Sequence, residues 1–320
     1  MLARVAENIY WLGRYIERAE NTSRLVKSTY DMMLDTPRSV DLKWTSLFEV
    51  LGNWPEQSQS QSQAQSSQSS ESFVMQNIIG DIDNISSIYS SIVSTRQIVR
   101  NSKELLPQAS WEVINNAYYF IKENQLLLET RQGRIRYCDK LRNSCEQFIG
   151  IIINNMERSD CYYFFRLGQL IERADMISRV IDSKATLVAF ENKPMQEASE
   201  SFHSAFWLNA LEALGCSQSF RRLNPDDVNK ESVIRFLLEE IRLPKTIMFS
   251  LEKLERLTDS LPNSDEVKLT ILTIKQWVHE CAESSFDDIT EQMDDLQLKL
   301  GKLHDVVYKQ YFSMVYEEAS

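Results

Sequence analysis

The sequence has no long apolar run: no stretch of about 18 consecutive apolar residues, the least that spans a membrane, occurs in its 320 residues. The N-terminal stretch also reaches Glu7 too soon to contain the apolar core of a secretory signal. We therefore expect neither a membrane-spanning helix nor a signal peptide, and we expect a cytoplasmic protein.

Residues with special chemistry are scarce as well. The three histidines, His203, His279 and His304, are isolated from one another, which gives no support to a Ser/His/Asp arrangement or to a zinc site. The five cysteines have no metal-ligand spacing and indicate reduced thiols: Cys138, Cys145, Cys161, Cys216 and Cys281. We expect no metal and no cofactor.

Glycine and proline are few, with 8 and 7 residues, and no segment alternates apolar and polar residues as a strand does. No Gly-rich phosphate loop follows a strand, which argues against a self-contained nucleotide site. The net charge of −11 argues against binding nucleic acids or anionic membranes. The fold class we predict is all-α.

One helical stretch occurs twice. Residues 11–26 (WLGRYIERAENTSRLV) and 166–181 (RLGQLIERADMISRVI) share eight of sixteen positions without a gap, at an offset of 155. Average composition predicts about one identity. A second pair, Trp44 to Gly52 and Trp207 to Gly215, repeats a Trp, Glu and Leu-Gly pattern. We therefore predict a tandem duplicated helical bundle whose two pseudo-equivalent halves, residues 1–158 and 159–320, share an interface.

The helices expected from periodicity, Pro and Gly cover residues 3–34, 41–52, 73–81, 86–106, 110–131, 134–157, 160–191, 200–215, 226–242, 244–261, 264–284 and 286–316. Pro244 is expected in the first turn of its helix and Asn263 as an N-cap. The tract 57–72 is almost purely Gln and Ser, which predicts a disordered loop because such a segment buries little apolar area.

The repeated helix has two faces. Helical spacing puts Ile9, Leu12, Ile16 and Ala19 on an apolar stripe that packing explains. The opposite face holds the residues that packing does not require: Tyr10, Gly13, Arg14, Glu17, Glu20, Asn21 and Arg24. Two interpretations remain open. Either Glu20–Arg24 and its copy Asp175–Arg179 are ordinary surface pairs, or the face meets another helix or a ligand.

The second interpretation is favoured by Gly13 and its copy Gly168, since a glycine inside a helix costs roughly 1 kcal/mol relative to alanine. Arg18 and Arg173 border the apolar stripe, where half-buried arginines usually meet carboxylates. Glu172 for Arg18 and Glu17 for Arg173 would satisfy both arginines. We predict that the two helices cross at the glycines with such a contact. Carboxylates and guanidiniums in a dry cleft suit a zwitterion, such as an amino acid or a peptide end. The binding candidates are Gly13, Arg14, Glu17, Arg18, Glu20, Asn21, Arg24, Gly168, Glu172, Arg173, Asp175 and Arg179.

The two ERA-centred stretches and the Trp…Leu-Gly elements resemble the bacterial alpha-E family, whose helical proteins have no assigned activity. Asn101 and Trp111 are similar to that family's helix with arginine and asparagine and its following tryptophan. Where the family often has Arg-Ser after a proline, this chain has Lys245-Thr246 after Pro244. The resemblance implies a place in a peptide-forming system, with a circularly permuted ATP-grasp ligase as partner and a transglutaminase-like protein as a further companion.

These observations leave three functional hypotheses. The first is a non-catalytic partner or substrate-binding component of the ATP-grasp amide or peptide ligase. The second is an enzyme acting on an amino acid or a peptide through the duplicated Glu and Arg residues. The third is an interaction protein unrelated to ligation. No residue is assigned a catalytic role from the sequence.

Overall fold

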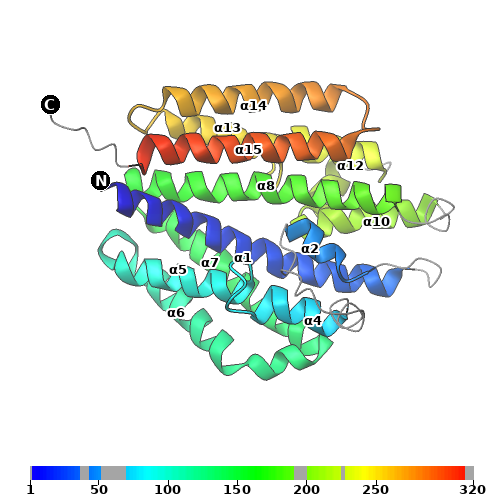
Figure 1. The fold of residues 1–320 in the computed structure, drawn as a ribbon, viewed down its shortest axis with the longest axis horizontal. Coiled ribbons are helices and arrows are strands. Elements are labelled where there is room, and N and C mark those ends of the chain that lie inside the picture. Colours follow the sequence, from blue (N-terminus) through cyan, green and yellow to red (C-terminus); the bar gives the residue numbers. More distant parts are fainter. Residues whose placement is uncertain (1, 37–42, 52–69, 191–199, 225–227, 314–320) are drawn as a thin grey trace, which may run out of the picture.

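The computed structural model describes residues 2–36, 43–51, 70–190, 200–224 and 228–313 (Figure 1). Every regular element in these ranges is a helix, so the predicted all-α class is confirmed. No helix in the described part of the chain combines the length and the apolar character that crossing a membrane requires.

Two long helices, α1 (Ala3–Asp35) and α8 (Asp160–Phe190), run through the middle of the molecule. In Figure 1, α12, α13, α14 and α15 lie above this central pair, and α4, α5, α6 and α7 lie below it. α1 packs against α8 and also against α5, α7 and α10, while α8 contacts α13, α15 and α2. Because neighbours surround it, α1 buries its apolar stripe and most of the face opposite the stripe.

The elements between α1 and α8 in the chain lie mostly on the α1 side, except α2, which packs against α8. They are α2 (Ser46–Leu51), α4 (Glu71–Met75), the π-turn η1 (Gln76–Gly80), α5 (Ile88–Asn101), the 3₁₀ turn η2 (Lys103–Leu105), α6 (Gln108–Glu123), the 3₁₀ turn η3 (Gln125–Glu129) and α7 (Arg131–Asn155). α5, α6 and α7 pack in sequence, α5 on α6 and α6 on α7.

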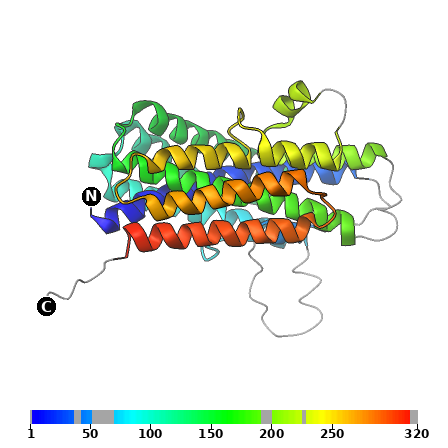
Figure 2. The same cartoon turned by 90° about the horizontal axis from the view of Figure 1, so that it is seen from above.

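The helices that follow α8 in the chain lie mostly on the α8 side, except α10, which packs against both α1 and α8. They are α10 (Glu200–Leu214), α11 (Ser217–Leu223), α12 (Lys230–Glu239), α13 (Ile247–Thr258), α14 (Asp265–Glu283) and α15 (Ile289–Tyr311). Figure 2, seen from above, shows α13, α14 and α15 side by side along the central helices.

Several helix ends differ from the predicted ones. Pro244 lies before α13 rather than in its first turn, because Thr246 takes the N-cap position. Asn263 has a φ of 52° and precedes Ser264, the N-cap residue of α14, so its predicted capping role is wrong. Gly215 has a φ of 74°, as the predicted helix C-cap requires. Gly52 lies outside the described residues.

Most of the Gln/Ser tract, residues 57–69, also lies outside the described residues. Its last three residues do not continue a loop. The Ser70 side chain accepts a hydrogen bond from the backbone N–H of Phe73 at 3.3 Å, and α4 begins at Glu71. The predicted boundary at residue 72 is therefore too late, because a serine N-cap followed by Glu in the first turn starts a helix.

Candidate functional site

α1 and α8 cross with almost no space between their backbones. A Cβ atom added to Gly13 would lie far closer than 3.0 Å to the carbonyl oxygen of Phe165, and 2.9 Å from the backbone nitrogen of Gln169. A Cβ atom on Gly168 would meet the carbonyl oxygen of Tyr10 in the same way. Both glycines are therefore required by the close approach of two helices, as their recurrence predicted.

Glu172 on α8 binds two arginines of α1. Its carboxylate accepts hydrogen bonds from Nε of Arg14 at 2.7 Å and from Nε and Nη2 of Arg18 at 2.6 and 3.1 Å. Burial alone would raise the pKa of Glu172, but the charges and hydrogen bonds of Arg18 and Arg14 outweigh it and lower the pKa to about 2. Glu172 is therefore ionised at neutral pH.

Glu17 on α1 has the reciprocal arrangement. Nε and Nη2 of Arg173 donate to its two oxygens at 2.7 and 2.8 Å, Gln169 donates at 2.8 Å, and the Lys245 ammonium lies at 3.3 Å. The Glu17 side chain is 0% exposed. Burial raises its pKa, yet the charges of Arg173 and Lys245 hold it well below its usual range. Both predicted Glu–Arg contacts between the two helices are confirmed.

Lys245 lies in the turn before α13, and its ammonium contacts polar side chains of α1. Its Nζ lies 2.7 Å from Oε2 of Glu20 and 3.3 Å from Oδ1 of Asn21, and the side chain is 17% exposed. Arg24 completes this group by donating to Glu20 at 2.5 and 3.0 Å and to Glu146 at 2.7 Å. Sequence reasoning placed Lys245 only as a departure from a family pattern and missed its contacts.

The expectation that these polar residues stand outside packing is wrong. Glu17, Glu20 and Asn21 are buried, and Arg24 is only 18% exposed. The reason is the position of α1 between two layers, which leaves it no solvent face along most of its length. Buried carboxylates require paired cations, so these ion pairs are a necessary part of the packing of α1.

A cavity of about 220 Å³ lies on the other side of the crossing, beside Glu172. Its walls come from α1, α2, α8 and the turn before α5, and the residues are Arg14, Arg18, Leu51, Ser86, Glu172, Asp175, Met176 and Arg179. Nε of Arg179 donates to Asp175 at 2.8 Å. Five of the predicted binding residues thus share one cavity: Arg14, Arg18, Glu172, Asp175 and Arg179. Of the other charged or amide candidates, Glu17, Glu20 and Asn21 contact Lys245, and two arginines, Arg173 and Arg24, bind these carboxylates.

The charges lining this cavity do not cancel. Three guanidiniums face two carboxylates, which leaves one positive charge. Each of the three arginines also keeps at least one guanidinium nitrogen that has no acceptor among the described residues. The arrangement can therefore accept a small anion that brings oxygen acceptors.

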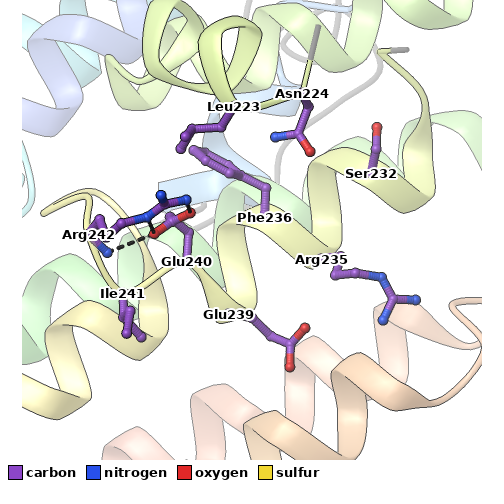
Figure 3. A pocket seen from close by; sticks show the side chains of 9 residues that line it. All are labelled: Leu223, Asn224, Ser232, Arg235, Phe236, Glu239, Glu240, Ile241 and Arg242. Carbon is purple, nitrogen blue, oxygen red and sulfur yellow. Dashed lines mark hydrogen bonds and ion pairs between the residues drawn. The ribbon is translucent and has the colours of Figure 1, made fainter. Parts of the chain in front are cut away.

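A larger hollow of about 570 Å³ lies along α11, α12 and the turn after α12 (Figure 3). Its charged side chains already have partners. Arg242 binds Glu240 at 2.7 and 2.8 Å, Arg235 donates to the carbonyl oxygen of Ala282 at 2.6 Å, and Glu239 contacts His279 at 3.2 Å. None of the predicted binding residues lines this hollow.

Other reactive groups are poorly placed for chemistry. All five cysteines are buried free thiols, and burial raises the pKa of Cys161, which disfavours the nucleophilic thiolate. Tyr10 bonds Nδ1 of His304 at 2.9 Å, a contact that sequence reasoning missed, and burial raises its pKa to about 12. The described residues include no group of three or more His, Cys, Asp or Glu that could hold a metal ion.

Comparison with known protein families identifies the family of this chain. The family model described as a predicted alpha-helical domain with a conserved ER motif matches residues 1–312. The chain belongs to the Alpha-E family. Two Glu-Arg dipeptides of this Alpha-E protein, Glu17-Arg18 and Glu172-Arg173, form the crossed ion pairs between α1 and α8. Searches of curated proteins and of solved structures found no significant match.

Proposed function

We propose that this Alpha-E protein is a non-catalytic binding component of an ATP-grasp amide or peptide ligase system. In this role it holds the carboxylate end of an amino acid or a peptide in the cavity beside Glu172. The observation that carries the binding part of the proposal is the excess positive charge of the cavity walls. The ligase and the transglutaminase-like companion follow from the resemblance to the family and remain part of the proposal.

The geometry supports a carboxylate as the ligand. Guanidinium groups bind carboxylates through paired N–H donors, and partial burial strengthens such contacts. The arginines cannot give up their charge, because Glu172 raises the pKa of both Arg14 and Arg18 against the effect of burial. The volume of about 220 Å³ falls below the roughly 300–1,000 Å³ of drug-sized ligand pockets. One residue or one chain end is therefore the expected occupant.

The same geometry weakens the alternative, an enzyme that uses the duplicated Glu and Arg residues. A general acid or base works best when its pKa lies near the operating pH. Glu172 has a pKa of about 2, and that of Glu17 is held well below its usual range. Each carboxylate is also occupied by at least two cationic partners. Their supported role is to fix the two helices and to orient the arginines.

We also infer that the chain arose by duplication of one unit, with residues 1–158 and 159–320 sharing the interface where α1 crosses α8. The support is the reciprocity of the crossing: each glycine meets the backbone of the other helix, and each Glu binds the arginine of the other helix. An approximate twofold axis produces this pattern, because each contact made by a residue of one helix is then repeated by the equivalent residue of the other helix.

Titration calorimetry with propionate and with alanyl-alanine tests the binding. We expect saturable binding by the full chain, weakened at least tenfold by Arg179→Gln. Arg256→Gln is the matched control, because Arg256 also forms an i,i+4 pair, with Glu252, on an exposed face. Absence of binding for both compounds, or equal effects of the two substitutions, overturns the site.

The partnership is tested separately, by a ligation assay with the ATP-grasp ligase in the presence and absence of this chain. We expect the rate of peptide-bond formation to rise when the chain is added and to rise less with Arg179→Gln. A purified chain that forms or cleaves amide bonds alone, with activity lost in a folded Arg179→Gln variant, would support the enzyme alternative instead.

A further inference from the structure

The cavity beside Glu172 has a filled counterpart in the other half of the chain. We propose that Lys245 is a built-in occupant of that counterpart, and that the open cavity takes the primary ammonium of its ligand at the corresponding place. The ligand is then an amino-carboxylate, and the chain holds one such ligand rather than two. This inference rests on the carboxylate-binding function proposed above and adds the amine to it.

The turns before α5 and α13 give the correspondence. Ser87 is the N-cap of α5, and its hydroxyl donates to the carbonyl oxygen of Asp81, six residues earlier. Thr246 is the N-cap of α13, and its hydroxyl donates to the carbonyl oxygen of Glu240, also six residues earlier. The residue immediately before each N-cap is Ser86 in one turn and Lys245 in the other.

The walls correspond as well. At the offset of 155, four cavity residues have counterparts around Lys245: Glu172 with Glu17, Asp175 with Glu20, Met176 with Asn21 and Arg179 with Arg24. The Lys245 ammonium contacts three of these counterparts, at 2.7 Å from Glu20 and at 3.3 Å from Glu17 and Asn21. The side chain of Ser86 is too short to fill the corresponding space beside α8, and this space is the cavity.

The position of the ammonium follows from this match. In the filled copy it lies nearest Glu20, so in the open copy it lies nearest Asp175, with Glu172 as the second carboxylate. Arg179 donates to the Oδ2 atom of Asp175, and the Oδ1 atom accepts no hydrogen bond from the described residues. An acceptor is thus available where the ammonium of the ligand is placed.

Charge explains why the ligand also needs a carboxylate. Around Lys245 the carboxylates of Glu17, Glu20 and Glu146 balance the cations of Arg173, Arg24 and Lys245, so this group is neutral once the ammonium is in place. In the open copy Arg14 stands where the filled copy has Gln169, and the walls already carry one positive charge. An amine without a carboxylate would raise that charge further, whereas a zwitterion leaves it unchanged.

Three-carbon compounds of matched size test the amine requirement by calorimetry with the full chain. We expect L-alanine or β-alanine to bind at least tenfold more tightly than propionate, and n-propylamine to bind at least tenfold more weakly than the better amino acid. If propionate binds as tightly as both amino acids, the amine recess is wrong while the carboxylate site stands. If none of the four binds, the proposed function fails as well.

Two substitutions test the correspondence itself. Ser86→Lys supplies the open cavity with its own occupant, and we expect it to abolish binding of the amino acid while the chain stays folded. Ser86→Gln is the control for steric blocking, because glutamine is similar in length to lysine but uncharged. The Ser86→Gln variant should bind the amino acid more tightly than the Ser86→Lys variant does. Equal binding by Ser86→Lys and the wild type overturns the correspondence.

The reciprocal change, Lys245→Ser, empties the filled copy and leaves Glu17 and Glu20 short of one cation. We expect a lower melting temperature that n-propylamine raises in a dose-dependent way, with a smaller effect of tetramethylammonium, which cannot donate hydrogen bonds. The wild type should show no such difference between the two cations. An equal response of Lys245→Ser to both cations means that its recess is not specific for an ammonium, and the inference fails.

Discussion

The closeness of α1 and α8 predicts an unusual effect of a small substitution, Gly13→Ala. The added Cβ would lie far closer than 3.0 Å to the Phe165 carbonyl oxygen, whereas ordinary contacts begin near 3.4 Å. The helices must therefore separate by about 1 Å or more, and overpacking of this kind costs about 1–3 kcal/mol. Separation also strains the buried Glu17–Arg173 pair, whose full loss would cost about 3–5 kcal/mol.

Alanine gains back roughly 1 kcal/mol through its higher helix propensity. We expect Gly13→Ala to lower the free energy of unfolding by about 2–4 kcal/mol, measured by urea denaturation with far-UV circular dichroism. Gly301→Ala in α15 is the control, because among the described residues no atom beyond its own helical turn lies within 4 Å of its added Cβ. It should stabilise the protein by about 0.5–1 kcal/mol. If Gly13→Ala stabilises the protein as much as Gly301→Ala does, the backbones of α1 and α8 are not in close contact at Gly13.

Further predictions concern single buried residues. Ile16→Ala should cost about 2–5 kcal/mol, since Ile16 is fully buried, and a loss below 1 kcal/mol in urea denaturation would contradict its place in the core. Arg24→Ala should lower the free energy of unfolding by about 1.5–3 kcal/mol because Glu20 loses a charged hydrogen bond. An unchanged stability, as expected for an exposed arginine, would contradict the burial of this pair. Glu17→Gln should cost about 3–5 kcal/mol by leaving the buried Arg173 without its anion, and a fully stable Glu17→Gln variant would refute this. Burial lowers the pKa of Lys184 from 10.5 to about 7; since the unfolded chain keeps the proton up to higher pH, stability relative to Lys184→Met should rise between pH 7 and 8.5, by at most about 1.4 kcal/mol per pH unit, and parallel pH profiles of the two proteins would exclude this titration.

The individual helices were largely predictable from local sequence. The apolar stripe of α1, the scarcity of glycine and proline, and the left-handed Gly215 each act within a few residues of the chain. The boundaries that were missed have local causes too. Ser70, Thr246 and Ser264 take N-cap positions that the apolar pattern did not distinguish from their neighbours.

Part of the site was also predictable, because the repeated stretch places its own residues in register. Gly13 and Gly168 recur where a helix gains nothing from glycine alone, which indicated a close approach from outside each helix. Glu17 with Arg173 and Glu172 with Arg18 followed from that symmetry, and the distances confirm both pairs.

Only the tertiary structure decided that α1 is surrounded, and therefore that Glu17, Glu20 and Asn21 are buried. Helical periodicity states which residues share a face, but it does not state what covers that face. Lys245 illustrates the limit, since it reaches Glu20 from 225 residues away in the chain. A contact between such distant residues depends on how the helices pack, and neither residue carries a local pattern that names its partner.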